Sequence, residues 1–173
     1  MTGERTDPKR AAPIYTPEQR RRRDETRWTL VQGILAPVQF LVFLVSLALV
    51  VRYLATGEGL MAAHASIVVK TLFLYVIMVT GAIWEKVVFG QYLCAPAFFW
   101  EDVVSFGVIA LHTAYLAALF TGWGGAETQM WIALAGYAAY VVNAVQFLYK
   151  MRAARLQGET AAAPAERAGE VAA

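Results

Sequence analysis

The stretch WTLVQGILAPVQFLVFLVSLALVV, residues 28–51, decides the fold of this chain. It holds 24 residues without a charge between Arg27 and Arg52. A helix needs about 20 mostly apolar residues to cross the roughly 30 Å hydrocarbon core of a bilayer. The stretch is therefore predicted to form a transmembrane helix.

Two more uncharged runs follow, residues 103–126 and 128–149. A fourth apolar segment, residues 66–88, contains Lys70, Glu85 and Lys86, and we expect Lys70 to lie near the membrane edge and extend to the headgroups. Hydrophobic side chains make up 58% of the chain, above the roughly 45–50% of soluble domains. The sequence predicts an all-α integral membrane bundle of four transmembrane helices, at about residues 30–54, 66–88, 102–121 and 129–149.

Basic residues gather near the two ends of the chain, at Arg5, Lys9, Arg10, Arg20, Arg21, Arg22, Arg23 and Arg27 and again at Lys150, Arg152, Arg155 and Arg167. The loops near residues 56–63 and 121–128 have neither Lys nor Arg. By the positive-inside rule both termini are predicted to be cytoplasmic, which agrees with an even number of spans. The chain has one cysteine, Cys94, which excludes an internal disulfide.

The segments outside the spans are polar. Residues 1–15 and 157–173 are predicted to be disordered tails around a membrane domain at residues 16–156. Thr16, Pro17 and Gln19 match a capping box with proline at the first helical position. They predict a short basic helix, which either lies on the membrane surface or only sets the orientation of the first span.

Polar residues recur on one face of three predicted spans: Gln32, Gln39, Ser46 and Tyr53; Glu101, Ser105, His112 and Tyr115; and Gly136, Tyr140, Asn143, Phe147 and Lys150. Polar faces within a bilayer turn toward other helices, so the bundle is predicted to have a polar interior. Most of these groups fall in the cytoplasmic half. The pattern therefore predicts a cup open to the cytoplasm, which is typical of a site and not of a channel.

The stretch IWEKVVFGQYLCAPAFFWED, residues 83–102, places Glu85, Glu101 and Asp102 among aromatic residues. Loss of hydration there favours the neutral acid, so one of these carboxyl groups could deliver a proton near neutral pH. Two structural alternatives stay open. Glu101 and Asp102 could cap the third span, and Glu85 could pair with Lys86.

His112 lies deep in the third span. It is either a packing residue hydrogen-bonded to Tyr115 or Thr113, or a ligand to the metal of a bound tetrapyrrole. Haem is excluded, because His64 lies near the opposite surface. The surrounding aromatic residues fit an interfacial belt or a flat conjugated ligand; they are Trp84, Phe89, Tyr92, Phe98, Phe99 and Trp100.

Three segments carry a resemblance to a known family: LVQGILAPVQFLVFLVSLALVVRYLATGEG, SIVVKTLFLYVIMVTGAIWEKVVFG and APAFFWEDVVSFGVIALHTAYLAALFTGW. They resemble the 3-vinyl (older name 2-vinyl) bacteriochlorophyllide hydratases of bacteriochlorophyll biosynthesis, over about residues 15–156. The resemblance implies hydration of the 3-vinyl group of chlorophyllide a or a bacteriochlorophyllide to 3-(1-hydroxyethyl). It also implies a multi-pass protein of the bacterial inner membrane, either cytoplasmic or intracytoplasmic photosynthetic.

On this basis we expect Glu101 to be the acid and Glu85 or Asp102 to orient the water. His112 would be an axial ligand or a packing residue, and Lys86 or Lys150 would meet the substrate propionate. The further substrate-binding candidates are Trp84, Phe99, Trp100, Gln39 and Asn143. No cofactor of the protein itself is expected, since the pigment carries the magnesium.

The expected partners are the pigment and the lipid bilayer, with no nucleic acid; other pigment-biosynthesis enzymes or a second copy of the chain stay open. Two rival functions also stay open. One is a non-enzymatic pigment-binding or photosystem assembly protein, which would not need three clustered carboxyl groups. The other is a small dimeric transporter, against which the one-sided polarity argues.

Overall fold

A computed structural model of the protein describes the backbone of residues 13–171 and side chains through residue 157. Its helices are α1 (Pro17–Glu25), α2 (Arg27–Thr56), α3 (Leu60–Phe89), α4 (Phe99–Thr121) and α5 (Gly125–Val171). None of the described residues forms a strand. Four helices are long and apolar enough to cross a membrane: α2, α3, α4 and the part of α5 at Gly125–Gln157. The prediction of an all-helical protein with four such helices is confirmed.

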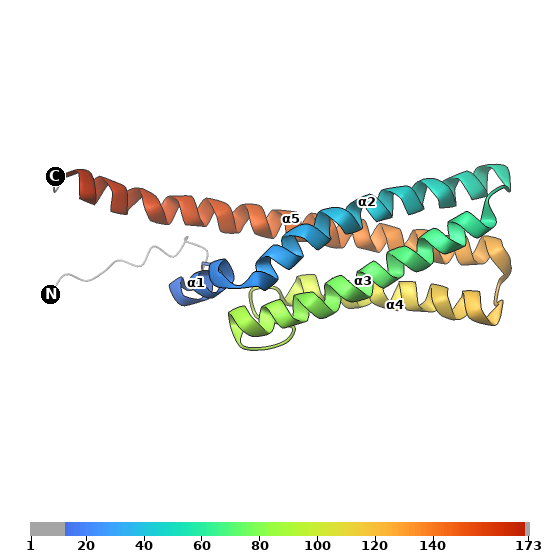
Figure 1. Cartoon of the computed structure of the whole chain (residues 1–173), viewed down its shortest axis with the longest axis horizontal. Helices are drawn as coiled ribbons and strands as arrows, with labels where there is room; N and C mark the ends of the chain where they lie inside the picture. Colours follow the sequence, from blue (N-terminus) through green and yellow to red (C-terminus); the bar gives the residue numbers. More distant parts are fainter. Residues whose placement is uncertain (1–12, 172–173) are drawn as a thin grey trace.

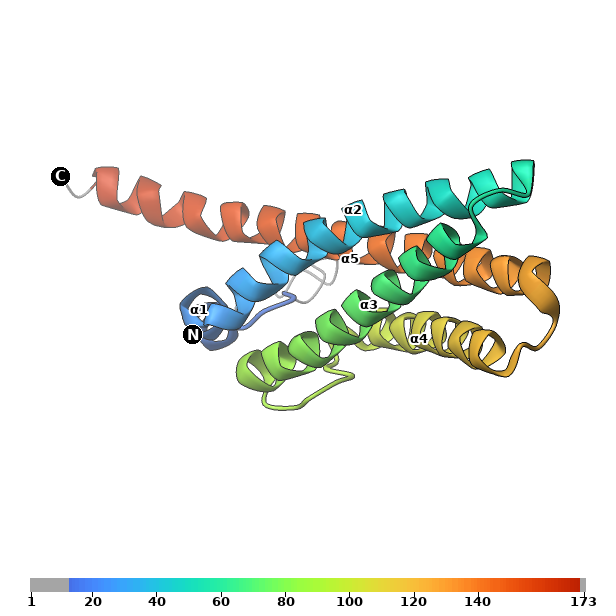
Figure 2. The same ribbon diagram turned by 45° about the vertical axis from the view of Figure 1, so that its right-hand side comes forward.

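The helices pack as two hairpins (Figures 1 and 2). α2 packs along α3 and α4 along α5, whereas the two hairpins meet over shorter stretches. The turn between α2 and α3 requires glycine, because Gly57 and Gly59 have φ angles of 74° and 85°, which side chains with a Cβ disfavour. α1 and the far end of α5 lie at the same end of the bundle.

α1 begins as the sequence predicts. The Thr16 hydroxyl accepts from Gln19 N at 3.2 Å, and Thr16 N donates to Gln19 Oε1 at 2.9 Å. Tyr15 holds this helix against the bundle, since its ring stacks on Phe89 with centroids 5.7 Å apart and lies under the Arg23 guanidinium. Burial raises the pKa of the Tyr15 phenol, and Arg23 opposes that shift. Contact of α1 with a membrane surface stays a prediction.

The start of α3 and the end of α5 differ from the sequence predictions. α3 starts at Leu60, so Lys70 lies ten residues, or about 15 Å, inside the helix. Its side chain is 0% exposed, and the prediction that it extends to the headgroups is wrong. Residues 157–171 continue α5, although the sequence predicts a disordered tail, because alanine-rich segments have high helix propensity. Residues 1–12 of the other predicted tail lie outside the described part of the chain.

The predicted polar interior is confirmed. On α2 the buried side chains are Gln39, Phe43, Ser46 and Val50, so the polar face turns inward. Large apolar side chains such as Leu41 and Val45 face outward. The polarity is not confined to one half, however. Ser46 is hydrogen-bonded to Tyr137 and Ser66, and His64 to Tyr115 at 2.7 Å. Polar groups therefore also occupy the half of the bundle beyond the predicted one-sided cup.

Candidate active site

Three buried carboxyl groups meet at the end of the bundle where α3 passes into α4. Glu85 lies one turn before the end of α3, and Glu101 and Asp102 lie in the first turn of α4. Their exposed fractions are 5%, 6% and 3%. The loop at residues 90–98 reverses the chain and brings α4 back against α3. The sequence prediction that these three residues share one place is consistent with this geometry.

Glu85 and Asp102 form a pair that the loop holds in position. Cys94 N donates to Asp102 Oδ2 at 2.6 Å, and Ala95 N donates to Glu85 Oε2 at 3.2 Å. The two carboxyl groups also interact with each other. A carboxylate has no proton to donate, so a hydrogen bond between two carboxyl groups needs one proton. The pair can therefore store a proton at a buried position.

Glu101 has a different environment. Lys150 Nζ lies 3.1 Å from Glu101 Oε1 and also donates to Ala97 O at 2.6 Å. The second oxygen, Oε2, is buried and has no hydrogen-bond partner among the described residues. Glu101 therefore offers one unused acceptor beside the Glu85–Asp102 pair.

Asn143 fixes the start of α4 against α5. Its Nδ2 donates to Glu101 O at 2.9 Å and to Ser105 Oγ at 3.0 Å. Asn143 thus contacts the backbone of Glu101 and not its carboxyl group. Its contacts in this structure hold two helices together.

The structural alternatives for the carboxyl groups have different outcomes. The N-cap of α4 is Phe98, which makes no side-chain cap hydrogen bond, but Glu101 and Asp102 lie in the first turn, where negative charge stabilises a helix. This structural role stays open, although Asp102 also accepts from the preceding loop. Lys86 is not the partner of Glu85, because its Nζ donates to Gly90 O at 2.7 Å and lies over the Tyr92 ring. Lys86 is exposed at the bundle end.

The aromatic residues divide into two groups. Trp84, Phe89 and Phe98 pack edge to face on one another, with centroids 5.6–5.8 Å apart. Phe99 and Trp100 are 44% and 68% exposed and pack against each other on the outer face of α4. The predicted aromatic surroundings of the carboxyl groups therefore include Trp84, whereas Phe99 and Trp100 face away from the interior.

His112 lies elsewhere. It is ten residues beyond Asp102, about 15 Å along the helix. Its Nδ1 bonds Val108 O at 2.8 Å, in place of the predicted bond to Tyr115 or Thr113. The structure therefore does not bring His112 to the carboxyl groups. Gln39 is 2% exposed, and its Oε1 has no hydrogen-bond partner among the described residues.

Sequence reasoning missed three contributions to the site. It proposed Lys150 only for a substrate propionate, and it assigned nothing to the amides of Cys94 and Ala95. A sequence gives no signal for a backbone donor in an irregular loop. Lys70 did carry a signal, because a lysine inside an apolar run marks an interior polar site more often than chance.

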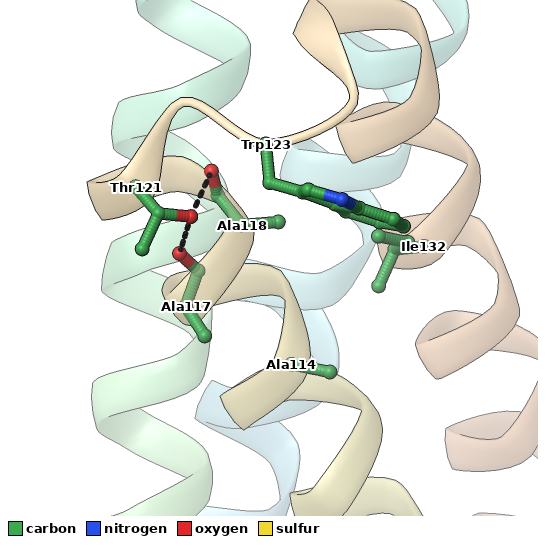
Figure 3. A pocket seen from close by; sticks show the side chains of 6 residues that line it. All are labelled: Ala114, Ala117, Ala118, Thr121, Trp123 and Ile132. Carbon is green, nitrogen blue, oxygen red and sulfur yellow. Dashed lines mark hydrogen bonds between the residues drawn. The ribbon is translucent and has the colours of Figure 1, made fainter.

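Neither a metal site nor the pocket in Figure 3 competes with this cluster. Residues 13–157 contain no group of three His, Cys, Asp or Glu side chains placed to hold a metal ion. The pocket, about 300 Å³, lies near the other end of α4 and is lined by Ala114, Ala117, Ala118, Thr121, Trp123 and Ile132. Its hydroxyl, on Thr121, already donates to Ala117 O at 2.7 Å. The pocket has no acid or base.

Comparisons with known proteins agree over most of the chain. The model of the family described as 2-vinyl bacteriochlorophyllide hydratase matches residues 15–153. The 2-vinyl bacteriochlorophyllide hydratase of Cereibacter sphaeroides is 73% identical over 154 residues, covering 87% of this chain and 96% of that protein. The protein with the same name from Rhodobacter capsulatus is 72% identical over 151 residues, covering 87% of each chain. No solved structure matches significantly.

Proposed function

The chain belongs to the 2-vinyl bacteriochlorophyllide hydratase family and is a hydro-lyase of bacteriochlorophyll biosynthesis, and from this premise we propose that its three buried carboxyl groups hydrate the pigment vinyl group. The observation that carries the proposal is the burial of Glu85 and Asp102, each held by a loop amide, beside the ion-paired Glu101. The ring-conjugated vinyl group lies against this cluster. The rest of the macrocycle extends into the bundle between the hairpins.

The reaction adds one water across a carbon–carbon double bond. A proton from the cluster forms a C–H bond at the terminal vinyl carbon, and the cation left on the inner carbon is stabilised by conjugation with the macrocycle. Water forms the new C–O bond there and loses a proton to a carboxylate. The product is the 1-hydroxyethyl group, and the cluster ends with as many protons as it began.

The geometry favours Glu85 as the acid. Asp102 accepts the shorter amide hydrogen bond, 2.6 Å against 3.2 Å, and amide donors stabilise the charged form. The shared proton therefore resides on Glu85. Lys150 pairs with Oε1 of Glu101, so the buried Oε2 is left to orient the water. This assignment exchanges the roles that the sequence suggested for Glu101 and Glu85.

The site opens toward the cytoplasm of the bacterial inner membrane. Arginines at positions 20–23 and Lys150, Arg152 and Arg155 all lie near the end of the bundle that carries the carboxyl groups, and the two loops at the opposite end have no Lys or Arg. The positive-inside rule then favours a cytoplasmic location for both termini. The substrate brings its own magnesium, and the mechanism uses no cofactor of the protein.

The hydratase is tested with purified full-length protein in nanodiscs and chlorophyllide a. Loss of the vinyl conjugation moves the long-wavelength absorption band to the blue, and the product mass rises by one water. Glu85→Gln should lower kcat by about 10²- to 10⁴-fold, the usual contribution of a general acid, without loss of pigment binding. Glu58→Gln, at the opposite end of the bundle, is the control and keeps full turnover.

The other outcomes are equally definite. Full turnover by Glu85→Gln removes this residue from the mechanism, and loss of turnover in Glu101→Gln alone restores the assignment suggested by the sequence. Wild-type protein that binds the pigment without converting it would be a carrier or assembly protein. Polar groups extend along the whole interior, so one-sided polarity is no longer an argument against a transporter. Membership of the hydratase family is the argument that remains against it.

A further inference from the structure

A second polar centre lies in the middle of the bundle. Each hairpin contributes to it, Lys70 from α3 and His112 from α4, with exposed fractions of 0% and 1%. Tyr137 of α5 joins them: Lys70 Nζ is 5.6 Å and the His112 ring 5.8 Å from the centroid of its ring. We name Lys70, His112 and Tyr137 the central cluster.

Two buried atoms of the central cluster have no hydrogen-bond partner among the described residues: Lys70 Nζ and His112 Nε2. His112 Nδ1 bonds a carbonyl oxygen, so Nδ1 carries the hydrogen and Nε2 is an acceptor. Of the two atoms, only Lys70 Nζ is a donor.

A buried donor without an acceptor is costly, and Lys70 has only a partial substitute. Its Nζ lies 4.1 Å from the centroid of the Tyr140 ring, a cation–π contact that leaves its hydrogen-bonding capacity unused. The other two lysines of the described chain differ, since Lys86 and Lys150 each donate to a backbone carbonyl. Lys70 is thus the described lysine available to an oxygen acceptor.

The position of the central cluster relates it to the carboxyl groups. Lys70 and Glu85 are 15 residues apart on α3, about 22 Å along the helix axis. The Lys70 amine lies over the Tyr140 ring, and Tyr140 is three residues, about 4.5 Å, before Asn143, which bonds Glu101 O. A flat pigment between the hairpins with its vinyl group at the carboxyl groups would therefore meet the Lys70 amine with an opposite, oxygen-bearing edge.

We propose that Lys70 binds the substrate by donating a hydrogen bond to an oxygen of the macrocycle remote from the vinyl group, either its ring ketone or its propionate carboxylate. This inference rests on the proposed function, because it takes the pigment as the ligand. It moves recognition of the polar edge from Lys86 and Lys150, at the end of the bundle, to the middle of the membrane.

The test is pigment binding, measured by titration of the long-wavelength absorption band in nanodiscs under conditions without turnover. Three pigments are compared: chlorophyllide a, the same pigment with its ring ketone replaced by a methylene group, and the same pigment with its propionate replaced by a propyl group. Lys70→Met should weaken the binding of chlorophyllide a by about 10- to 100-fold, as expected for the loss of a hydrogen bond that involves a charged group. Thr71→Val is the matched control, since Thr71 is equally buried and its hydroxyl bonds Ile67 O of its own helix.

The pigment that lacks the contacted oxygen should bind wild type and Lys70→Met equally. Equal binding of the methylene pigment identifies the ketone as the partner, and equal binding of the propyl pigment identifies the propionate. Unchanged binding of all three pigments by Lys70→Met, or the same loss for all three, overturns the inference. If the variant does not fold, wild type that binds all three pigments with one affinity overturns it instead.

Turnover separates this inference from the proposed mechanism. Wild-type protein that binds through Lys70 and adds no water would contradict the mechanism and leave the Lys70 contact intact. Conversion that depends on Glu85, with pigment affinity independent of Lys70, would support the mechanism and contradict the Lys70 contact.

Discussion

Gly136 is the residue on which the position of His112 depends. A Cβ built on Gly136 would lie 2.9 Å from His112 Cε1 and 3.0 Å from Nδ1. The imidazole cannot move away easily, because Nδ1 is bonded to Val108 O inside the bundle. The sequence analysis placed Gly136 on the polar face of the last span but did not explain why a glycine stands there. The close approach of His112 explains it.

Gly136→Ala should lower the free energy of unfolding by about 1–3 kcal/mol, as overpacking does in close-packed interiors. Thermal unfolding in detergent measures the change. Gly107→Ala is the control, since a Cβ on Gly107 meets nothing within 4 Å, and alanine favours helix. Equal stability of the two variants would contradict the contact with His112.

Individual residues of the site could be predicted only in part. Glu85, Glu101 and Asp102 stood out because charges inside apolar, aromatic surroundings are expensive and functional. Their partners could not be predicted, because the donors are loop amides and Lys150, whose approach depends on how α5 crosses α4. Lys70 was misplaced because the start of α3 was set six residues too late.

At the scale of helices, one ion pair joins α5 to α4. Lys150 reaches both the Glu101 carboxyl group and the carbonyl of Ala97 in the loop before α4. Glu101 is buried whereas the Lys150 side chain is 26% exposed. Loss of the lysine would therefore leave a buried carboxylate without its partner.

Lys150→Met should destabilise the protein by about 1–3 kcal/mol, less than the 3–5 kcal/mol of a fully buried pair, because water partly screens Lys150. The double variant Lys150→Met with Glu101→Gln should recover most of this loss, since no buried charge remains. Chemical denaturation of the four proteins gives the coupling energy. Additive effects would mean that the ion pair contributes no stability.

The helices themselves were predictable to a larger extent than their ends. Charge-free runs identify spans because the hydrocarbon core sets their length, and the heptad spacing of Gln39 and Ser46 identified the inward face of α2. The C-terminal segment was misjudged, since its composition resembles disordered chains while its alanines favour helix. The boundary of α3 at Gly59 depends on a left-handed residue that hydropathy does not detect.

For the whole molecule, orientation is the property that the fold leaves to experiment. The single cysteine, Cys94, lies in the loop beside the carboxyl groups and is partly exposed. A membrane-impermeant maleimide should label it in inverted vesicles and not in intact spheroplasts if the site is cytoplasmic. A Cys94→Ala protein carrying Glu58→Cys on the opposite loop should label only in spheroplasts. The reverse pattern would contradict the proposed orientation.

The division of both polar centres between two hairpins has a consequence for biogenesis. The first hairpin is synthesised before the second, and it carries Lys70 and Glu85 into the bilayer before Tyr140, Cys94 and Asp102 have arrived. Until then these groups lack the neighbours that surround them in the finished bundle, and an unpartnered charge inside a bilayer is costly. The first hairpin should therefore be less stable alone than in the whole chain, because only the second hairpin completes the surroundings of Lys70 and Glu85.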